Sequence, residues 1–525
     1  MGKRKQLELS NEASMFSKLK NRSNQHHFRT EHLKTNLGVA TARGSLITFA
    51  WHGAKFFIAL AATAFMARLL KPEDYGLIGM VAVITTYISM FKDMGLSMAT
   101  VQKAEISFEQ VSTLFWINVA ISLVISAFTI AIAPGIAWLY HEPKLTAISM
   151  VTTLGFVIGG LSVQHEALLK RQMRFSALGL IGFIAMVMGY VVGILMAWRG
   201  FGYWALVGSQ ISLIGTNTLL VWFVCGWVPG LPKRNTGVRP MLNLGRNITG
   251  YAMLNVFARN MDALVIGRQL GAQPVGLYSK GYQLINLPTD NTNEPLNTIA
   301  LPALSRLADD PVRYRDAYLR MLEKVVLLIM PCVAVMFVAS DWIVQVVLGP
   351  QWAQTAPVLS LLAISAVMYP VANSALWLMI SQGRAKDMLR WAILGAPLSI
   401  LSYVIGLRWG VLGVAASYSL ARLFVIDPLL YFYAGRTGPV KTRDIYRVTL
   451  PFVAAAVVSA VVCLIFRRFV VITHPLVGLV SCTLLVAVTD ILVLGLLPIG
   501  RSAIKDAIHT LMLFLNRKPQ AQVSI

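Results

Sequence analysis

Five charged side chains stand out because they lie inside long apolar stretches of the sequence. Lys55 is near the middle of the first stretch, Arg259 and Asp262 are in the seventh, and Asp290 and Glu294 are in the eighth. An ionisable side chain at the centre of a bilayer costs about 2.5–3.5 kcal/mol on insertion scales, so such residues usually face a protein interior and serve a function. We therefore take these five as the candidate binding residues.

Their spacing indicates what each could do. Arg259 and Asp262 are three residues apart and share a helix face, where they could neutralise each other without a ligand. Asp290 and Glu294 are four residues apart, so two ionised carboxylates would repel, and we expect one to be protonated or paired with a cation from elsewhere. Lys55 has no acidic residue in its own stretch. If the five converge, they line a cleft that carries both signs of charge.

The composition requires these residues to be positioned by membrane helices. The chain has 525 residues, of which 56% are hydrophobic and 13% charged, and its mean hydropathy is +0.64. A soluble domain has about 25% charged residues, so a water-soluble enzyme is excluded. A helix needs about 20 apolar residues to cross a bilayer. Fourteen stretches meet this requirement, at 44–67, 76–99, 111–139, 145–165, 175–198, 203–228, 247–267, 276–301, 322–348, 354–381, 388–407, 410–434, 447–466 and 475–498.

The positive charge follows the topology that these stretches imply. If the amino-terminal tail is cytoplasmic, alternate loops place 34 of the 46 Lys and Arg residues inside and nine outside, among them Lys280. This is the bias that short loops of membrane proteins show. The net charge of +23 is thus explained by topology, and we expect both termini to be cytoplasmic and no nucleic-acid partner.

Other polar residues in apolar stretches have structural explanations. Arg422 and Asp427 approach the cytoplasmic end of the twelfth stretch, where a long cation can extend to the interface and Asp427-Pro428 can end a helix. Asp490 receives no role. The four cysteines have no paired spacing and are expected to pack as small apolar side chains. The sequence predicts no metal site, no cofactor and no catalytic residue.

Two halves of the chain carry related residues at an offset of 200, including Arg68 with Arg268 and Gly76 with Gly276. Both copies begin on the same side, as parallel repeats of transporters do. We predict an all-α integral membrane protein of about fourteen transmembrane helices, with two six-helix pseudo-repeats and two carboxy-terminal helices. The predicted parts are a basic tail at 1–43, a six-helix bundle at 44–228, a basic linker at 229–246, a second six-helix bundle at 247–434, two further helices at 435–498 and a cytoplasmic tail at 499–525.

Several motifs carry a family resemblance. They are RLLKPEDYG at 68–76, DMGLS at 93–97, GYWALV at 202–207, NMD at 260–262 and LPALSR at 301–306. In this order they resemble the polysaccharide transporter family, the Wzx-type flippases of lipid-linked oligosaccharides, over roughly residues 40–440. The subgroup most similar exports colanic-acid-like and other exopolysaccharide units. The resemblance implies membership of the superfamily that includes the multidrug and peptidoglycan-precursor exporters.

The resemblance implies a function and partners. The expected activity is translocation of undecaprenyl-diphosphate-linked repeat units across the bacterial inner membrane, by alternating access, with cation or proton coupling as an option. Lys55 or Arg259 would bind the pyrophosphate, and Asp290 or Glu294 would couple transport to a proton. Membrane lipids, a polysaccharide polymerase and chain-length or export proteins are the expected partners.

Three alternatives remain open on the sequence. A peptidoglycan-precursor flippase would share fourteen spans and a cationic cleft. A cation-coupled drug exporter would share the twelve-span core, usually without the two extra spans. An integral-membrane glycosyltransferase or polymerase would carry its catalytic residues on a sizeable external loop, whereas the external connections here are about ten residues or shorter.

Overall fold

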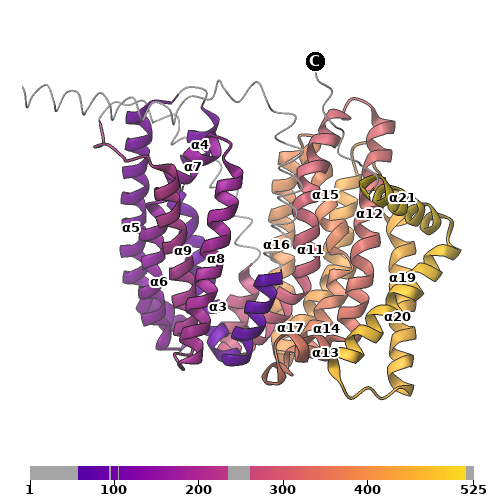
Figure 1. Ribbon diagram of the computed structural model, residues 1–525. Helices are drawn as coiled ribbons and strands as arrows, with labels where there is room; N and C mark the ends of the chain where they lie inside the picture. The colour runs from indigo at the N-terminus through magenta and orange to yellow at the C-terminus, as the bar shows by residue number, and fades with distance from the viewer. Residues whose placement is uncertain (1–56, 94–95, 104–105, 234–259, 516–525) are drawn as a thin grey trace, which may run out of the picture. The chain divides into compact units, whose positions relative to one another are not determined.

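The computed structural model describes residues 57–93, 96–103, 106–233 and 260–515, which form helices and contain no strand (Figure 1). Helices also cover Phe57–Leu69 and residues 260–270. The labelled helices are α3 (Pro72–Asp93), α4 (Leu96–Gln102), α5 (Phe108–Tyr140), α6 (Lys144–Gly160), α7 (Val163–Arg171), α8 (Phe175–Trp198), α9 (Trp204–Cys225), α11 (Ala272–Arg306), α12 (Pro311–Val338), α13 (Ser340–Val347), α14 (Thr355–Ala366), α15 (Tyr369–Ser381), α16 (Ala385–Gly406), α17 (Gly410–Ala421), α18 (Asp427–Gly435), α19 (Thr442–Phe469), α20 (Pro475–Leu496) and α21 (Pro498–Leu515).

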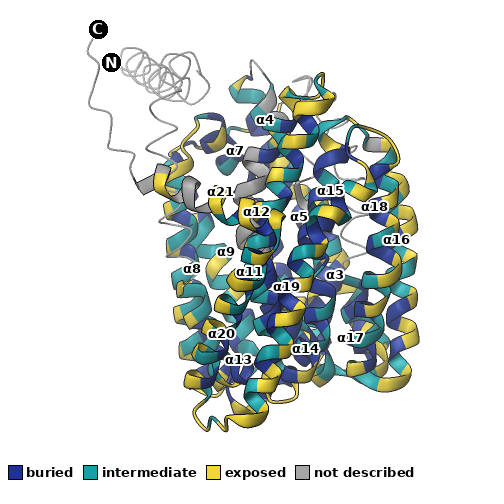
Figure 2. Ribbon diagram, turned by 90° about the vertical axis from the view of Figure 1, so that its right-hand side faces the viewer, coloured by how far each residue is buried: buried dark blue, intermediate teal, exposed yellow. Residues whose placement is uncertain are grey.

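The predicted all-α membrane class is confirmed. Among the described residues, nine helices are long and apolar enough to cross a bilayer, or ten if one bent pair is a single span. Helix α16 has exposed residues along its length (Figure 2), and the apolar side chains of Ile393, Leu401 and Val404 are among them. The predicted number of fourteen stays a prediction, because the first and seventh stretches extend into residues outside the described ranges.

Helix starts follow local sequence signals. Ser107 caps α5 by accepting from the backbone N–H of Gln110, and the Gln110 side chain accepts from the backbone N–H of Ser107 at 3.2 Å, which completes a capping box. Asp310 caps α12 by accepting from the N–H of Arg313 at 3.1 Å, with Pro311 in the first helical turn. These signals fix where the two long helices begin.

The chain divides into two compact units, Met1–Phe257 and Ala258–Ile525. In unit 1, α8 packs along α9 and α5 along α6. In unit 2, α11 packs against α12, α14 and α15, and α19 packs against α12 and α20. The finer division into two six-helix bundles, a linker and two further helices stays a prediction.

Corresponding elements of the two units repeat at constant offsets. Helix α3 begins at Pro72 and α11 at Ala272, so the offset of 200 found in the sequence extends to these helix starts. Further along the chain the offset is 210. Helices α8 and α9 span 175–225, and helices α16 to α18 span 385–435. Gly200 and Gly410, also 210 apart, both have a positive φ, of 81° and 68°. The repeat therefore extends to a glycine of positive φ at the connection before the next helix.

In unit 1, α8 and α9 form a hairpin, and α16 to α18 form the corresponding one in unit 2. One arginine in each unit joins the two ends of its hairpin in the same way. Arg174 donates from Nη1 to the carbonyl of Val224 at 3.2 Å, and Arg384 donates from Nη1 to the carbonyl of Ala434 at 2.8 Å. Both pairs are 50 residues apart and both place a cation at a helix carboxyl end, where unpaired carbonyls and the helix dipole favour it. Asp387 holds Arg384 in place through Nε at 2.9 Å.

Three predicted segments contain a break, a bend or a helix that the length of the apolar stretches did not predict. The stretch at 145–165 contains a break between α6 and α7, and the stretch at 354–381 bends by 40° between α14 and α15. The predicted tail at 499–525 contains α21, which lies across the direction of the neighbouring helices in Figure 1 and packs against α12, α19 and α20. Arg501 joins α21 to α20 by donating to the carbonyl of Gly495 at 2.6 Å.

Gly406 and Gly413 allow α16 and α17 to pack backbone against backbone. A Cβ at Gly406 would collide with the carbonyl of Gly413 and with the Ser417 hydroxyl. Close approach of small residues is a common way of packing helices in lipid, where burying larger apolar side chains gains little.

We expect Gly406→Ala to destabilise the protein by about 1–3 kcal/mol, because the added methyl group must displace the α17 backbone. Gly495→Ala in α20 is the matched control, since a Cβ there meets no atom within 4 Å. Alanine has the higher helix propensity, so the control should be neutral or stabilising. Thermal unfolding of the detergent-purified chains measures both, and equal unfolding temperatures would contradict the tight contact.

Candidate functional site

The structure describes only some of the five binding residues that the sequence predicts. Lys55 and Arg259 lie outside the described residues. Asp290 and Glu294 lie in the middle of α11, whose backbone is described there while these two side chains are not. Asp262 is described, in the helix at 260–270, and is 7% exposed. The convergence of the five in one cleft therefore stays a prediction.

Asp262 is a buried carboxylate at the amino-terminal side of unit 2. One of its oxygens accepts from the backbone N–H of Ala263 at 2.7 Å. At the offset of 200, the corresponding residue of unit 1 is Ala62, which is also buried. The two units thus keep the same inward-facing position and differ in its chemistry, with a charge in unit 2 and a methyl group in unit 1.

Lys280 is a second buried charge of unit 2 that the sequence assigned differently. Charge counting placed it with the external loops, whereas the structure buries it in α11 at 7% exposure. Its ammonium group donates to the Gln283 side chain at 2.9 Å. The corresponding residue of unit 1 is Met80, which is fully buried. Its position inside the eighth apolar stretch was the signal that would have marked it as intramembrane.

Arg422 and Asp427 form a buried, forked ion pair. Nε of Arg422 donates to Asp427 Oδ2 at 2.9 Å and Nη2 donates to Oδ1 at 2.8 Å. The Arg422 side chain is 18% exposed and that of Asp427 is 1% exposed. Such two-point contacts combine the strength of charge-assisted hydrogen bonds with a fixed geometry. Arg422 therefore points into the protein rather than extending to the membrane interface.

A π-helical turn brings these two residues to the same side of the chain. Residues five apart diverge on an α-helix, but residues 422–426 form a π-helix in which the N–H of Asp427 donates to the carbonyl of Arg422. Pro428 follows, and a proline in a continuous helix lacks the N–H and crowds the carbonyl four residues before it. Asp427-Pro428 thus begins α18 instead of ending a helix, as the sequence had suggested.

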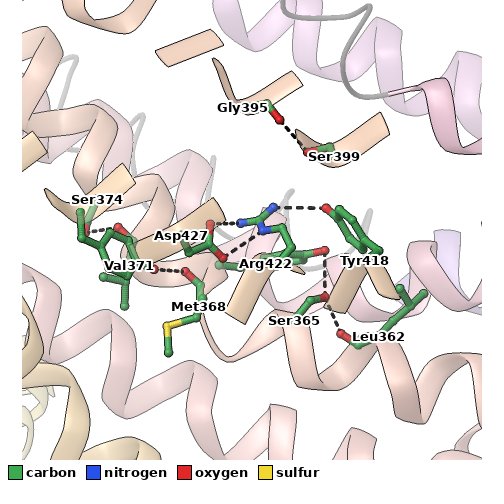
Figure 3. A network of polar contacts seen from close by, with 12 residues as sticks. Leu362, Ser365, Met368, Val371, Ser374, Gly395, Ser399, Tyr418, Arg422 and Asp427 are labelled. Carbon is green, nitrogen blue, oxygen red and sulfur yellow. Dashed lines mark hydrogen bonds and ion pairs between the residues drawn. The ribbon is translucent and has the colours of Figure 1, made fainter. Parts of the chain in front are cut away.

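Tyrosines enclose the Arg422 guanidinium on its remaining sides. Its Cζ atom lies 4.7 Å from the centroid of the Tyr369 ring, and Nη1 donates to the Tyr418 hydroxyl at 3.2 Å. Figure 3 shows Arg422 with Asp427 and Tyr418, and also Ser365, whose hydroxyl lies 3.4 Å from the Tyr369 hydroxyl. Cation–π attraction is strongest for such desolvated cations.

The same network fixes the break between α14 and α15. The Tyr431 hydroxyl of α18 donates to the carbonyl of Met368 at the break, at 3.1 Å, while Tyr369 begins α15 under Arg422. The same carbonyl accepts the backbone N–H of Ala372 at 2.9 Å, so the Tyr431 hydroxyl joins α18 to the start of α15 without replacing a helical hydrogen bond. The Arg422 guanidinium is paired with the Asp427 carboxylate, so the pair carries no net charge. The pair links helices and is not a site open to a phosphate.

The chain matches known families in sequence. The family model described as polysaccharide biosynthesis protein matches residues 65–357, more than half of the chain, and the model described as lipid II flippase MurJ matches residues 281–482. The lipopolysaccharide biosynthesis protein WzxC of Escherichia coli is 25% identical, over 70% of this chain and 75% of that protein. The teichuronic acid biosynthesis protein TuaB of Bacillus subtilis is 24% identical, over 58% of this chain and 64% of that protein. The succinoglycan biosynthesis transport protein ExoT of Rhizobium meliloti is 23% identical, over 63% and 67%.

Solved structures share the fold. Lipid II flippase MurJ in its inward closed conformation has a TM-score of 0.67 at 12% identity, covering 86% of this chain and 97% of that one. The inward-facing structure of a multidrug resistance MATE family transporter has a TM-score of 0.58 at 12% identity, covering 75% and 96%. At these identities the likeness concerns the fold alone.

The family matches, the named relatives and the apolar helices identify a multi-pass membrane transporter, not an enzyme. Within that class, the chain belongs to the polysaccharide biosynthesis protein family, which confirms the resemblance to the Wzx-type exporters inferred from the motifs.

We expect removal of either partner of the Arg422–Asp427 pair to cost about 3–5 kcal/mol, because the other charge is left buried and unpaired. Arg422→Leu and Asp427→Leu should each lower the unfolding temperature strongly. The double variant should recover most of the loss, since it buries no charge. Thermal unfolding of all four proteins forms a double-mutant cycle. Additive losses in the double variant would show that the two residues do not act as a pair.

Proposed function

We propose that the protein is a flippase for undecaprenyl-diphosphate-linked oligosaccharide repeat units used in surface polysaccharide biosynthesis. The single observation that carries this proposal is the polysaccharide biosynthesis family match over residues 65–357. The curated relatives support it, because they are named for lipopolysaccharide, teichuronic acid and succinoglycan biosynthesis or transport. The chemistry is consistent with it, because a substrate with a charged pyrophosphate and neutral sugars needs a membrane protein with both charged and hydroxyl-bearing interior positions.

The mechanism proposed is alternating access by the two units. Two repeats that share helix starts and arginine-closed hairpins can act as halves that rock about a substrate path, as parallel repeats do in other transporters. The inner membrane is the expected location, with both termini in the cytoplasm. That orientation places the exposed Arg313, Arg436 and Lys505 at the cytoplasmic side. A polysaccharide polymerase and chain-length or export proteins are the proposed protein partners.

Recognition of the substrate is proposed to involve the charges identified in the sequence. Lys55 and Arg259 are the proposed ligands of the pyrophosphate, because cations hold phosphate strongly where water is excluded. Asp262, Asp290 and Glu294 are proposed to face the same path, with Asp290 or Glu294 carrying the coupling proton. Support for this grouping comes from the position of Asp290 and Glu294 in α11, the helix that also buries Lys280.

A lipid II flippase is the second candidate, and one observation favours it. Residues 281–482 match the MurJ family model, a segment that extends into α19 and α20 beyond the polysaccharide match. Both candidate substrates carry the same lipid diphosphate and differ in the saccharide. The names of the sequence relatives favour the surface polysaccharide repeat unit.

Deletion of the gene tests the proposed function. We expect the deletion strain to lose surface polysaccharide and to accumulate lipid-linked repeat units on the cytoplasmic side, because synthesis continues while export stops. Complementation with the intact gene should restore the polymer, which glycan analysis of the cell surface measures. Rescue of a strain depleted of its lipid II flippase, with surface polysaccharide unchanged in the deletion strain, would favour the second candidate.

The coupling role is tested by the double variant Asp290→Asn, Glu294→Gln. We expect it to remove the dependence of transport on a pH gradient, because neither amide can carry the proton. The measurement is uptake of extracted lipid-linked repeat units in vesicles, with and without an imposed gradient. Asp490→Asn in α20 is the control carboxylate outside the repeated core. Full gradient dependence in the double variant would exclude both residues as the coupling site.

A further inference from the structure

Unit 1 contains a polar cavity between three of its helices. The cavity has a volume of about 150 Å³, comparable to that of an engineered protein cavity that binds benzene, and can therefore hold one ring-sized group. Its polar lining comes from Thr85, Thr86 and Ser89 of α3, Thr152 of α6 and Gln210 of α9. Phe156 and aliphatic side chains of α9 provide the apolar part of the lining. These positions lie inside the helices, away from their ends.

The hydroxyl oxygens that line this cavity can accept hydrogen bonds from a ligand. The Thr85 hydroxyl donates to the carbonyl of Val81 at 3.0 Å, the Ser89 hydroxyl to that of Thr86 at 2.7 Å, and the Thr152 hydroxyl to that of Ile148 at 2.7 Å. A hydroxyl has one donor and two acceptor sites, so each oxygen keeps acceptor capacity after its proton is committed to its own helix. The Gln210 amide adds both a donor and an acceptor.

The absence of charge narrows the class of ligand. Among the residues that the structure describes, none that lines the cavity is ionisable. A diphosphate would lose its hydration without gaining a cation, and a cationic drug would find no carboxylate. A neutral ligand rich in hydroxyl donors matches acceptors spaced over three helices, and an aromatic ring with aliphatic neighbours matches the C–H faces of a sugar ring.

We propose that this cavity of unit 1 binds a neutral sugar of the lipid-linked substrate, apart from the charges that bind its diphosphate. The proposal rests on the proposed function and deepens it, because it assigns saccharide recognition to hydroxyl-bearing positions of α3, α6 and α9. It also separates the two chemical parts of the substrate. The uncharged cavity would bind the sugar, and the proposed cations Lys55 and Arg259 would bind the diphosphate that all such lipids share.

The test compares two lipids on the full, detergent-purified chain. One is the undecaprenyl-diphosphate-linked repeat unit extracted from the deletion strain, and the other is undecaprenyl diphosphate without sugar. Native mass spectrometry gives a Kd for each. We expect the intact chain to prefer the sugar-bearing lipid, and Thr86→Val with Gln210→Leu to reduce that preference about tenfold, as the loss of one or two hydrogen bonds predicts. Affinity for the bare lipid should remain unchanged.

A matched double variant controls for general effects of the substitutions. Thr483→Val with Gln345→Leu makes the same chemical changes at exposed positions of α20 and α13, outside the cavity, and should leave both affinities unchanged. Equal binding of the two lipids by the intact chain, or an equal loss of both in the cavity variant, would overturn the cavity proposal alone. Binding of neither lipid would overturn the proposed function with it.

Discussion

The structure depends on one constraint, which is that hydrocarbon offers no water to a broken helix. Every interruption must therefore be completed by protein groups. Arginines supply several of these groups in the described part of the chain, and the Tyr431 hydroxyl links α18 to a further break. Arg174 and Arg384 bind carbonyls at the ends of hairpins, Arg501 binds the end of α20, and Arg422 pairs with Asp427 across a π-turn. The arginine guanidinium is permanently charged and has several N–H donors in a fixed plane, so it suits the binding of carbonyls and carboxylates better than any other side chain.

The two units use one scaffold for different chemistry. Their helix starts, a glycine of positive φ and arginine-closed hairpins correspond at offsets of 200 and 210. At inward-facing positions, however, unit 1 has Ala62 and Met80 where unit 2 has Asp262 and Lys280. Unit 1 instead carries an uncharged cavity lined by hydroxyls. A substrate with one charged and one neutral part is suited to two halves that have diverged in this manner.

Much of the fold was predictable because lipid imposes simple rules on sequence. Apolar length located the described helices, and motifs such as the segment at 68–76 identified the family, while the orientation that cation placement indicates stays a prediction. The charged site was less predictable. Charge counting assigned Lys280 to a loop because it lies near the end of its stretch, yet it lies inside α11, eight residues after the helix begins, and is buried. The sequence predicted a helix end at Asp427-Pro428, because proline usually ends helices. In the structure a π-helical turn joins α17 directly to α18 at this point.

The sequence by itself determined the class of protein, the approximate spans, the repeat and the family, because each follows from composition or from order along the chain. Only the tertiary structure decided which polar residues are partners. Arg422 contacts Asp427, Tyr369 and Tyr418, and the cavity of unit 1 joins residues up to 129 apart in the sequence, from Thr85 to Ile214. Such groupings depend on how helix faces turn toward one another, and that rotation is set by packing between helices rather than by the residues of any one of them.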